Sequence, residues 1–414
     1  MNSSLGNVFN GEKINGVRIY GNLGEQLWDE MPEGFLSQIE NFLEIYWVAL
    51  PYDDNKDNYH KKHQELQKLL GAVKNTRQFS QTKEPAGRKC SLDGERNALF
   101  YRHSEAGSIP HIQTDAQPIQ THNDLLTPGE ALSAISLGKR FYENKEDKQE
   151  FPSTAEIALM KVINEDILKG KHYKKYFEGR FDYQFCYEEN LTKEALIKSG
   201  INILLKYTLF DVQKACKALT ENIRTKYYAI LVFDGDNMGK MWSGEGLSLT
   251  VTSQLQMFQQ RLAIRLGIYA TYATAYINGN IQAIEDETCK TYIDLVRECK
   301  DHNSGGAYKS RITSLDIQKG KTVYAGGDDF LGFVNLNYLF EVMKELRKAY
   351  TALVEVPIKQ EFQSFSGTLT FTAGVAIAHY TEPLSVVLGE ARAAERAAKN
   401  AFENDDKNAF SMAV

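Results

Sequence analysis

Several features are missing from this chain of 414 residues, and each absence excludes a class of protein to which the chain could belong. No run of about 18 apolar residues occurs, which excludes a membrane-spanning helix. The N-terminal stretch MNSSLGNVFNGEKING lacks a basic segment followed by an apolar one, so no secretion signal is expected. We therefore expect a cytoplasmic protein with no membrane partner.

Patterned cysteines and an excess of positive charge are also absent. The five cysteines are not spaced as C-x-x-C, which argues against a disulfide framework and against a readable four-ligand zinc site. The formal net charge is −6. That charge argues against a protein that coats nucleic acid by charge alone, although it leaves room for a local basic groove.

After residue 225 the hydrophobic pattern of the sequence becomes regular enough to predict individual strands and helices. We expect strands at 227–233, 321–325, 330–334, 369–377 and 408–414, with helices at 255–276, 338–353 and 384–402. The order β-α-β-β-α-β predicts an α+β fold of the ferredoxin-like kind, an antiparallel sheet with helices packed on one face. Upstream, residues 86–224 mix turns and helices, with one helix expected to start at Thr127 and Pro128.

Four aspartates lie at the expected ends of the central strands. Asp234 and Asp236 follow the first strand in DGD, and Asp328 and Asp329 end the hairpin sequence GGDD. Because the first strand and the hairpin are neighbours in a ferredoxin-like sheet, we expect these carboxylates to meet. Their repulsion would raise their pKa values unless cations neutralise them, and Mg²⁺ or Mn²⁺ prefers such oxygen ligands.

This pattern predicts metal-dependent nucleotidyl transfer. Two ions about 3.5–4 Å apart can activate a hydroxyl and stabilise the leaving pyrophosphate, and such transfer needs little beyond positioning and charge neutralisation. A lone DGD or GGDD is usually only a turn, so the prediction depends on finding both at strand ends. The residues expected to approach or contact the triphosphate are Gly235, Asn237, Gly239, Lys240, Gly326, Gly327 and Lys399. For Lys399, a solvated helix lysine is an equal alternative.

The segments FDGDNMGK, YAGGDDF and FTAGVAIAHYTEPLSVVLGEARAAERAAKNAF resemble a known family. They are similar to the second palm (cyclase) domain in the large subunit of type III CRISPR effector complexes, specifically the type III-B branch. From about Phe42 onward, EIYWVALPY, KNTRQF, KCSLDGERNALFYR, LTPGEALSAISLGKRF and FPSTAEIAL resemble other parts of that subunit. The resemblance implies a partial first palm-like region and linker at 1–85, a mainly helical middle domain at 86–224 and a GGDD palm domain at 225–414.

The resemblance also implies an activity. With the other type III-B subunits, guide RNA and target RNA, the family's palm uses ATP and divalent metal in antiviral defence. Many members make cyclic oligoadenylate second messengers. Two alternatives stay open: transfer of AMP to S-adenosylmethionine, and a non-catalytic scaffold.

Residue roles follow from the resemblance position by position. Asp234 and Asp328 would be direct metal ligands, Asp329 would help to activate the attacking 3′-hydroxyl, and Asp236 would support the metal or its waters. The ATP-binding set would comprise Gly235, Asp236, Asn237, Met238, Gly239, Lys240, Gly326, Gly327 and Lys399.

Three departures from the family pattern stand out. No His-Asp dipeptide occurs, so an HD nuclease domain is not expected. Where relatives have C-x-x-C, Cys90 is followed at that spacing by Asp93, and a further expected cysteine is Ser133 or a neighbour. Zinc is therefore not expected. We also expect the first palm domain to be incomplete and the C-terminal helical tail to be missing. These parts could be missing from the protein itself or only from this sequence.

Overall fold

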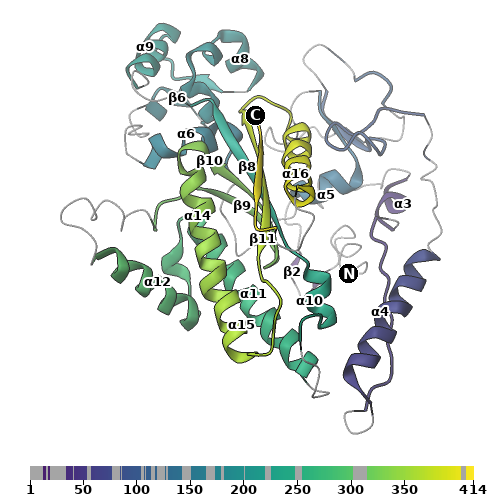
Figure 1. Ribbon diagram of the computed structural model, residues 1–414. Helices are drawn as coiled ribbons and strands as arrows, with labels where there is room; N and C mark the ends of the chain where they lie inside the picture. The colour runs from purple at the N-terminus through teal and green to yellow at the C-terminus, as the bar shows by residue number, and fades with distance from the viewer. Residues whose placement is uncertain are drawn as a thin grey trace. The chain divides into compact units, whose positions relative to one another are not determined.

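Figure 1 shows the computed structural model of the chain. It describes residues 13–14, 17–18, 34–40, 42–53, 57–76, 84, 86–103, 107, 109–112, 117–118, 126, 129–141, 151–164, 173–178, 181–199, 201–219, 225–247, 254–301, 315–401 and 407–414. The chain divides into two compact units: Met1–Pro51 with Glu65–Glu150, and Tyr52–Gln64 with Phe151–Val414. Residues 151–224, which the sequence analysis placed in the middle domain, thus share a unit with the expected palm domain.

The larger unit is built on a five-stranded sheet with the order β12-β11-β8-β10-β9. Central β8 pairs antiparallel with β10 and β11, β9 pairs antiparallel with β10, and β12 runs parallel to β11 at the edge. The α+β class and the last edge strand are therefore confirmed. The bounds are β8 Tyr227–Gly235, β9 Gly320–Ala325, β10 Asp329–Asn335, β11 Phe371–His379 and β12 Phe410–Ala413.

Helices cover both faces of this sheet, so the expectation of helices on one face was wrong. Helices α11 (Gln254–Asn278) and α14 (Leu339–Tyr350) share a core with alternate residues of β8. The intervening residues of β8 pack in a second core with α6 (Thr154–Asn164) and α16 (Leu384–Asn400). The sequence signal for this is the unbroken apolar run of β8, which is typical of a strand buried on both faces.

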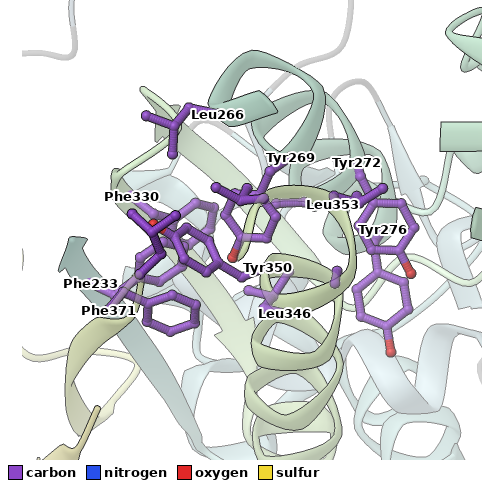
Figure 2. Close-up of a cluster of buried hydrophobic side chains, with 14 of the residues drawn as sticks. Phe233, Leu266, Tyr269, Tyr272, Tyr276, Phe330, Leu346, Tyr350, Leu353 and Phe371 are labelled. Carbon is purple, nitrogen blue, oxygen red and sulfur yellow. The ribbon is translucent and has the colours of Figure 1, made fainter. Parts of the chain in front are cut away.

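Aromatic rings join the sheet to the helices on the α11 and α14 face (Figure 2). The ring of Phe233 in β8 stacks against Phe330 of β10 and Phe371 of β11, with centroid distances of 4.8 and 4.3 Å. Tyr269 of α11 and Tyr350 of α14 meet edge to face at 5.0 Å. Such pairs add about 0.5–1.5 kcal/mol each beyond the free energy of burying their area. Phe233 and Phe330 are the sequence neighbours of Asp234 and Asp329, so this packing supports the strand ends that carry the aspartates.

Helix α14 continues further than the sequence indicated. A π turn at Thr351–Glu355 leads into α15 (Val356–Glu361). Pro357 has no N–H to donate to the preceding turn, and a widened turn is one way in which a helix accommodates proline. Helix α12 (Glu287–Asp301), which was not predicted, follows α11.

The smaller unit contains a short sheet, β4-β3-β5, beside two helices. Thr127 and Pro128 lie outside the described residues, but residues 131–132, which the predicted helix would include, form a strand, and the next described helix begins at Ala134. Strands of two residues are too short to leave a period in the sequence, which explains why a mainly helical region was expected there. The elements are β3 Phe100–Tyr101, β4 Gln117–Pro118, β5 Ala131–Leu132, α3 Phe35–Glu40 and α5 Ala134–Phe141.

The other regular elements are short, apart from α4. Their bounds are β1 Lys13–Ile14, β2 Val17–Arg18, α4 Tyr59–Asn75, β6 Phe177–Glu178, α8 Lys193–Lys198, β7 Asn202–Ile203, α9 Leu209–Leu219 and α10 Met238–Ser243, with 3₁₀ turns at Tyr183–Cys186, Glu188–Asn190, Ile281–Ala283 and Leu336–Tyr338. Within the described residues, every helix is too short or too polar to cross a bilayer.

Candidate active site

Strand pairing brings the DGD turn and the GGDD tip together. Asp234 at the end of β8 lies directly opposite Asp329 at the start of β10. Side chains opposed in this way have Cβ atoms about 4.5–5.5 Å apart. Asp328 precedes Asp329 in the β9–β10 connection, and a Cβ atom placed on Gly235 would lie 3.0 Å from the Cβ of Asp328. The structure thus gathers Asp234, Asp328 and Asp329 at one end of the sheet.

The electrostatics of this end show the effect of crowding like charges. The pKa of Asp328 is raised first by burial and then by the charge of Asp234. The pKa of Asp329 is raised by burial and by Asp234, Asp328 and Glu395. Both shifts favour the protonated carboxyl, so the ionised pair is held under repulsion.

Lys399 from α16 is part of the same cluster. Its ammonium donates to Asp234 and lies 2.7 Å from Glu395, and its side chain is 20% exposed. Burial lowers the pKa of Lys399, but the hydrogen bonds to Asp234 and Glu395 outweigh it and leave the pKa raised. The alternative of a solvated helix lysine is therefore wrong.

Glu395 was missed by the sequence analysis. Its available signal was the spacing of four residues from Lys399, which places both side chains on one face of α16.

Asp236 is buried behind the cluster, with 1% of its surface exposed. Its Oδ2 accepts hydrogen bonds from the Thr370 hydroxyl at 2.8 Å and the Asn408 amide at 3.1 Å. Its Oδ1 accepts from the Thr372 hydroxyl at 2.7 Å. These contacts tie the DGD turn to β11 and to the segment before β12. The three donors were missed as well, although Thr372 is a polar residue within an otherwise apolar strand.

The residues from 235 to 240 differ in how much open space they face. Gly235 has no room for a side chain, because a Cβ there would come within 2.6 Å of Met238 Cγ. Met238 is itself buried, whereas Asn237 adopts the left-handed conformation with φ 55° and precedes α10. A Cβ on Gly239 would meet no heavy atom within 4 Å. Lys240 is partly exposed, 3.7 Å from Glu245.

The hairpin tip is fixed against α11. Gly327 has φ +101°, and a Cβ there would lie 2.7 Å from the Cβ of Leu266. The Gly326 amide donates to the Asp329 carbonyl at 2.8 Å, which closes the turn. The half-exposed ring of Tyr324 lies over Gly326. Glycine at 326 and 327 therefore lets the acidic tip sit close to its neighbours.

The fit of a metal ion can be judged from the donors. In the part of the chain that the structure describes, no group of three or more His, Cys, Asp or Glu residues is arranged to hold one. Asp234 is paired with Lys399, and both oxygens of Asp236 accept hydrogen bonds. Asp328 and Asp329 offer only carboxylate oxygens, which suit Mg²⁺ or Mn²⁺, and a cation would relieve the repulsion that raises their pKa values.

Comparison with known proteins points to one family. Residues 227–411 match the family model described as Cas10/Cmr2, second palm domain. The CRISPR system Cmr subunit Cmr2 of Pyrococcus furiosus is 25% identical over 351 residues, 78% of this chain and 35% of that protein. The chain thus spans about a third of the length of this curated relative. These matches confirm the resemblance to the large subunit of type III-B complexes.

Solved structures of type III complexes are also similar. In the type III-B Cmr-beta complex bound to cognate target RNA, the matching chain has a TM-score of 0.42 and 15% identity, over 84% of this chain and 48% of that one. In the Csm1–Csm4 cassette in complex with cA3, the values are 0.28 and 17%, over 46% of this chain and 21% of that one.

Proposed function

We propose that this chain is a metal-dependent nucleotidyltransferase subunit of an RNA-guided type III-B CRISPR complex, which converts ATP into cyclic oligoadenylate messengers. One observation carries the proposal: Asp234 and Asp329 face each other across β8 and β10, with Asp328 beside them. The match of residues 227–411 to the second palm domain of Cas10/Cmr2 supports the reaction class.

The carboxylates have distinct proposed roles. Asp234 and Asp328 would bind Mg²⁺ or Mn²⁺, and Asp329 would help to remove the proton of the attacking 3′-hydroxyl. The bound cations would neutralise charge on the triphosphate and the leaving pyrophosphate. Asp236 would support the metal indirectly, because its oxygens hold the DGD turn in place through Thr370, Thr372 and Asn408.

The same geometry suggests where the triphosphate would lie. The open space around Gly239 would leave room for phosphate oxygens after the DGD turn, whereas the glycines at 326 and 327 pack against Tyr324 and Leu266 and hold the acidic tip in place. Lys240 would contact them from the turn after β8. Lys399, which already reaches Asp234, would contact a phosphate bound next to that carboxylate.

The proposed setting is a cytoplasmic complex. Its other subunits, the guide RNA and the target RNA would be the partners through which the palm is activated. The similarity to Cmr2, which is described as a subunit of the CRISPR Cmr system, supports this setting. A scaffold without catalysis fits the site less well, because a site without catalytic function would have no reason to keep carboxylates whose pKa values are raised by burial and by one another's charge.

The test uses the assembled complex, target RNA and labelled ATP, with and without S-adenosylmethionine. We expect target RNA to trigger oligoadenylate formation. The variant Asp328→Asn/Asp329→Asn should lose on the order of 10³-fold in turnover, as removal of cation ligands should produce, while RNA binding stays unchanged. Asp294→Asn, which removes an exposed carboxylate on α12, is the control and should keep full activity.

The products separate the alternatives. If an AMP conjugate forms instead, and only when S-adenosylmethionine is present, then the acceptor is S-adenosylmethionine and the product is not a cyclic oligoadenylate. Equal turnover in the wild type and the Asp328→Asn/Asp329→Asn variant would remove the catalytic assignment altogether.

A further inference from the structure

Two pairs of residues in the smaller unit share the spacing of a zinc site without its chemistry. Cys90 and Asp93 form one pair, Ser133 and Ser136 the other, each separated by two residues. Two C-x-x-C pairs are the usual frame of a structural zinc site with four thiolates. Here only one position of the four carries a thiol.

The second residue of the first pair makes direct contact with both members of the other pair. The Oδ2 atom of Asp93 accepts hydrogen bonds from the Ser133 hydroxyl at 2.9 Å and the Ser136 hydroxyl at 2.8 Å. Ser133 also caps the start of α5, because its Oγ accepts from the Ser136 amide at 3.2 Å. One carboxylate oxygen therefore joins the turn after Cys90 to the first turn of a helix some forty residues later in the chain.

The other oxygen of Asp93 organises its own turn. Oδ1 accepts from the amides of Glu95 at 2.9 Å and Arg96 at 3.2 Å, while the Gly94 amide donates to the Cys90 carbonyl at 3.0 Å. The two segments are further tied through Ser91 and Ala131, whose backbones are joined by an N–H···O bond of 2.8 Å. Together, these bonds do what a bound metal does in a zinc knuckle: they close a tight turn and fasten it to a second segment.

The charge of Asp93, which is itself an exposed residue, and the burial of its two serine partners match this role. The two serines are buried, at 0% and 7% exposure. Burial by itself would raise the pKa of Asp93, but hydrogen bonds from the amides and hydroxyls outweigh it and lower the pKa to about 2. The carboxylate is therefore ionised at neutral pH, with four donors directed at its two oxygens.

The donor set does not fit zinc. Structural zinc takes thiolate and imidazole ligands, whereas this set has one thiol, one carboxylate and two hydroxyls. The thiol is 3% exposed and packs in a core with Leu99 and Phe100. To bind a metal, the Asp93 carboxylate would also have to give up hydrogen bonds that it already accepts from two amides and two hydroxyls.

We propose that Cys90, Asp93, Ser133 and Ser136 keep the frame of a four-ligand zinc site in which the Asp93 carboxylate has replaced the metal as the cross-link. The smaller unit folds without zinc as a result. This proposal does not depend on the activity assigned to the palm, because all of its residues lie in the other compact unit.

The test restores the missing thiols in the full chain. The variant Asp93→Cys/Ser133→Cys/Ser136→Cys, together with native Cys90, should bind one equivalent of Co²⁺ with a thiolate-to-cobalt charge-transfer band. Zn²⁺ should displace the Co²⁺, and a chelator should then lower the Tm of this variant by several degrees. The wild type, dialysed after growth with added zinc, should contain far less than one zinc per chain, with a Tm unaffected by chelator.

Two results of this metal-binding experiment would overturn the proposal. One is a wild-type chain that retains one equivalent of zinc. The other is a triple-cysteine variant that has the wild-type circular dichroism spectrum but binds no Co²⁺.

A second variant covers the case in which the triple substitution does not fold. Asp93→Ala should lower the Tm by several degrees with no change in metal content, since it leaves two buried hydroxyls and two amides without their acceptor. The control Glu95→Gln changes an exposed carboxylate in the same turn and should leave the Tm in place. A Tm for Asp93→Ala equal to that of the wild type would contradict the proposal.

Discussion

The contacts of Asp236 predict two different outcomes for two small substitutions. Both oxygens of this buried carboxylate accept hydrogen bonds, from the hydroxyls of Thr370 and Thr372 and from the amide of Asn408. Asp236→Ala removes the acceptor and leaves two buried hydroxyls, those of Thr370 and Thr372, and the amide of the exposed Asn408 without it. Asp236→Asn can keep all three bonds, because its amide oxygen can take the place of Oδ2 while its NH₂ group donates to the Thr372 hydroxyl.

The magnitude follows from those three bonds. An unpaired buried polar group costs about 1–3 kcal/mol, and local relaxation recovers part of the sum. We expect Asp236→Ala to lower the free energy of unfolding of the larger unit by about 4 kcal/mol, or about 8–16 °C in Tm. For Asp236→Asn the expected loss is about 1 kcal/mol or less, which reflects only the weaker bonds of a neutral acceptor.

Thermal unfolding and Mn²⁺ binding, measured on the wild type, Asp236→Ala, Asp236→Asn and Asp234→Asn, test this reasoning. Asp236→Asn should keep most of the wild-type affinity for Mn²⁺, whereas Asp234→Asn should lose it. If Asp236→Asn is as stable as the wild type but binds Mn²⁺ as weakly as Asp234→Asn, then Asp236 is a direct ligand and the positioning role is refuted. If Asp236→Ala is as stable as Asp236→Asn, the three hydrogen bonds do not hold the turn.

The remaining predictions concern the repulsion at the hairpin tip and its backbone. Because the folded state raises the pKa values of Asp328 and Asp329 above the ordinary 3.8, it favours their protonated forms. The associated stability is fully present below that value and is lost as the pH rises through the raised values. The Tm of Asp328→Asn/Asp329→Asn should therefore exceed that of the wild type increasingly as the pH rises above about 4, and Mg²⁺ should reduce the gap. A gap that does not change with pH would argue against the raised pKa values of the buried, like-charged pair. Gly327→Ala should cost about 1–3 kcal/mol, since its φ of +101° and the neighbouring Leu266 both oppose a side chain. Gly239→Ala meets open space, so its Tm should stay unchanged while the KM for ATP rises; an unchanged KM would place the triphosphate elsewhere.

The candidate site was predictable to the extent that it depends on strand ends. The apolar run before Asp234 and the two strand-like runs around GGDD were enough to place three aspartates at one end of a sheet, because antiparallel pairing of neighbouring strands fixes which residues face each other. The role of Lys399 could be stated only as an even choice from the sequence. The structure decided it, since the ammonium reaches Asp234 from α16.

Other features left no readable signal. The strands at 100–101 and 131–132 are two residues long, so neither period nor composition marks them. The second face of the sheet is covered by α6 together with α16, and α6 precedes β8 by more than sixty residues in a region that the sequence assigned elsewhere. The continuation of α14 through Pro357 runs against the usual effect of proline and depends on a π turn.

The sequence by itself determined the α+β class, the order of the palm strands and which carboxylates stand at their ends, because these follow from local hydrophobic patterns and turn residues. Only the tertiary structure decided how each charged group is used. Asp236 holds a turn, Lys399 neutralises Asp234, and Asp93 fastens two segments, since each role depends on partners that lie from two to 172 residues away and are brought together by packing. Local patterns specify where a side chain starts, whereas its hydrogen bonds and its pKa depend on everything that the fold places around it.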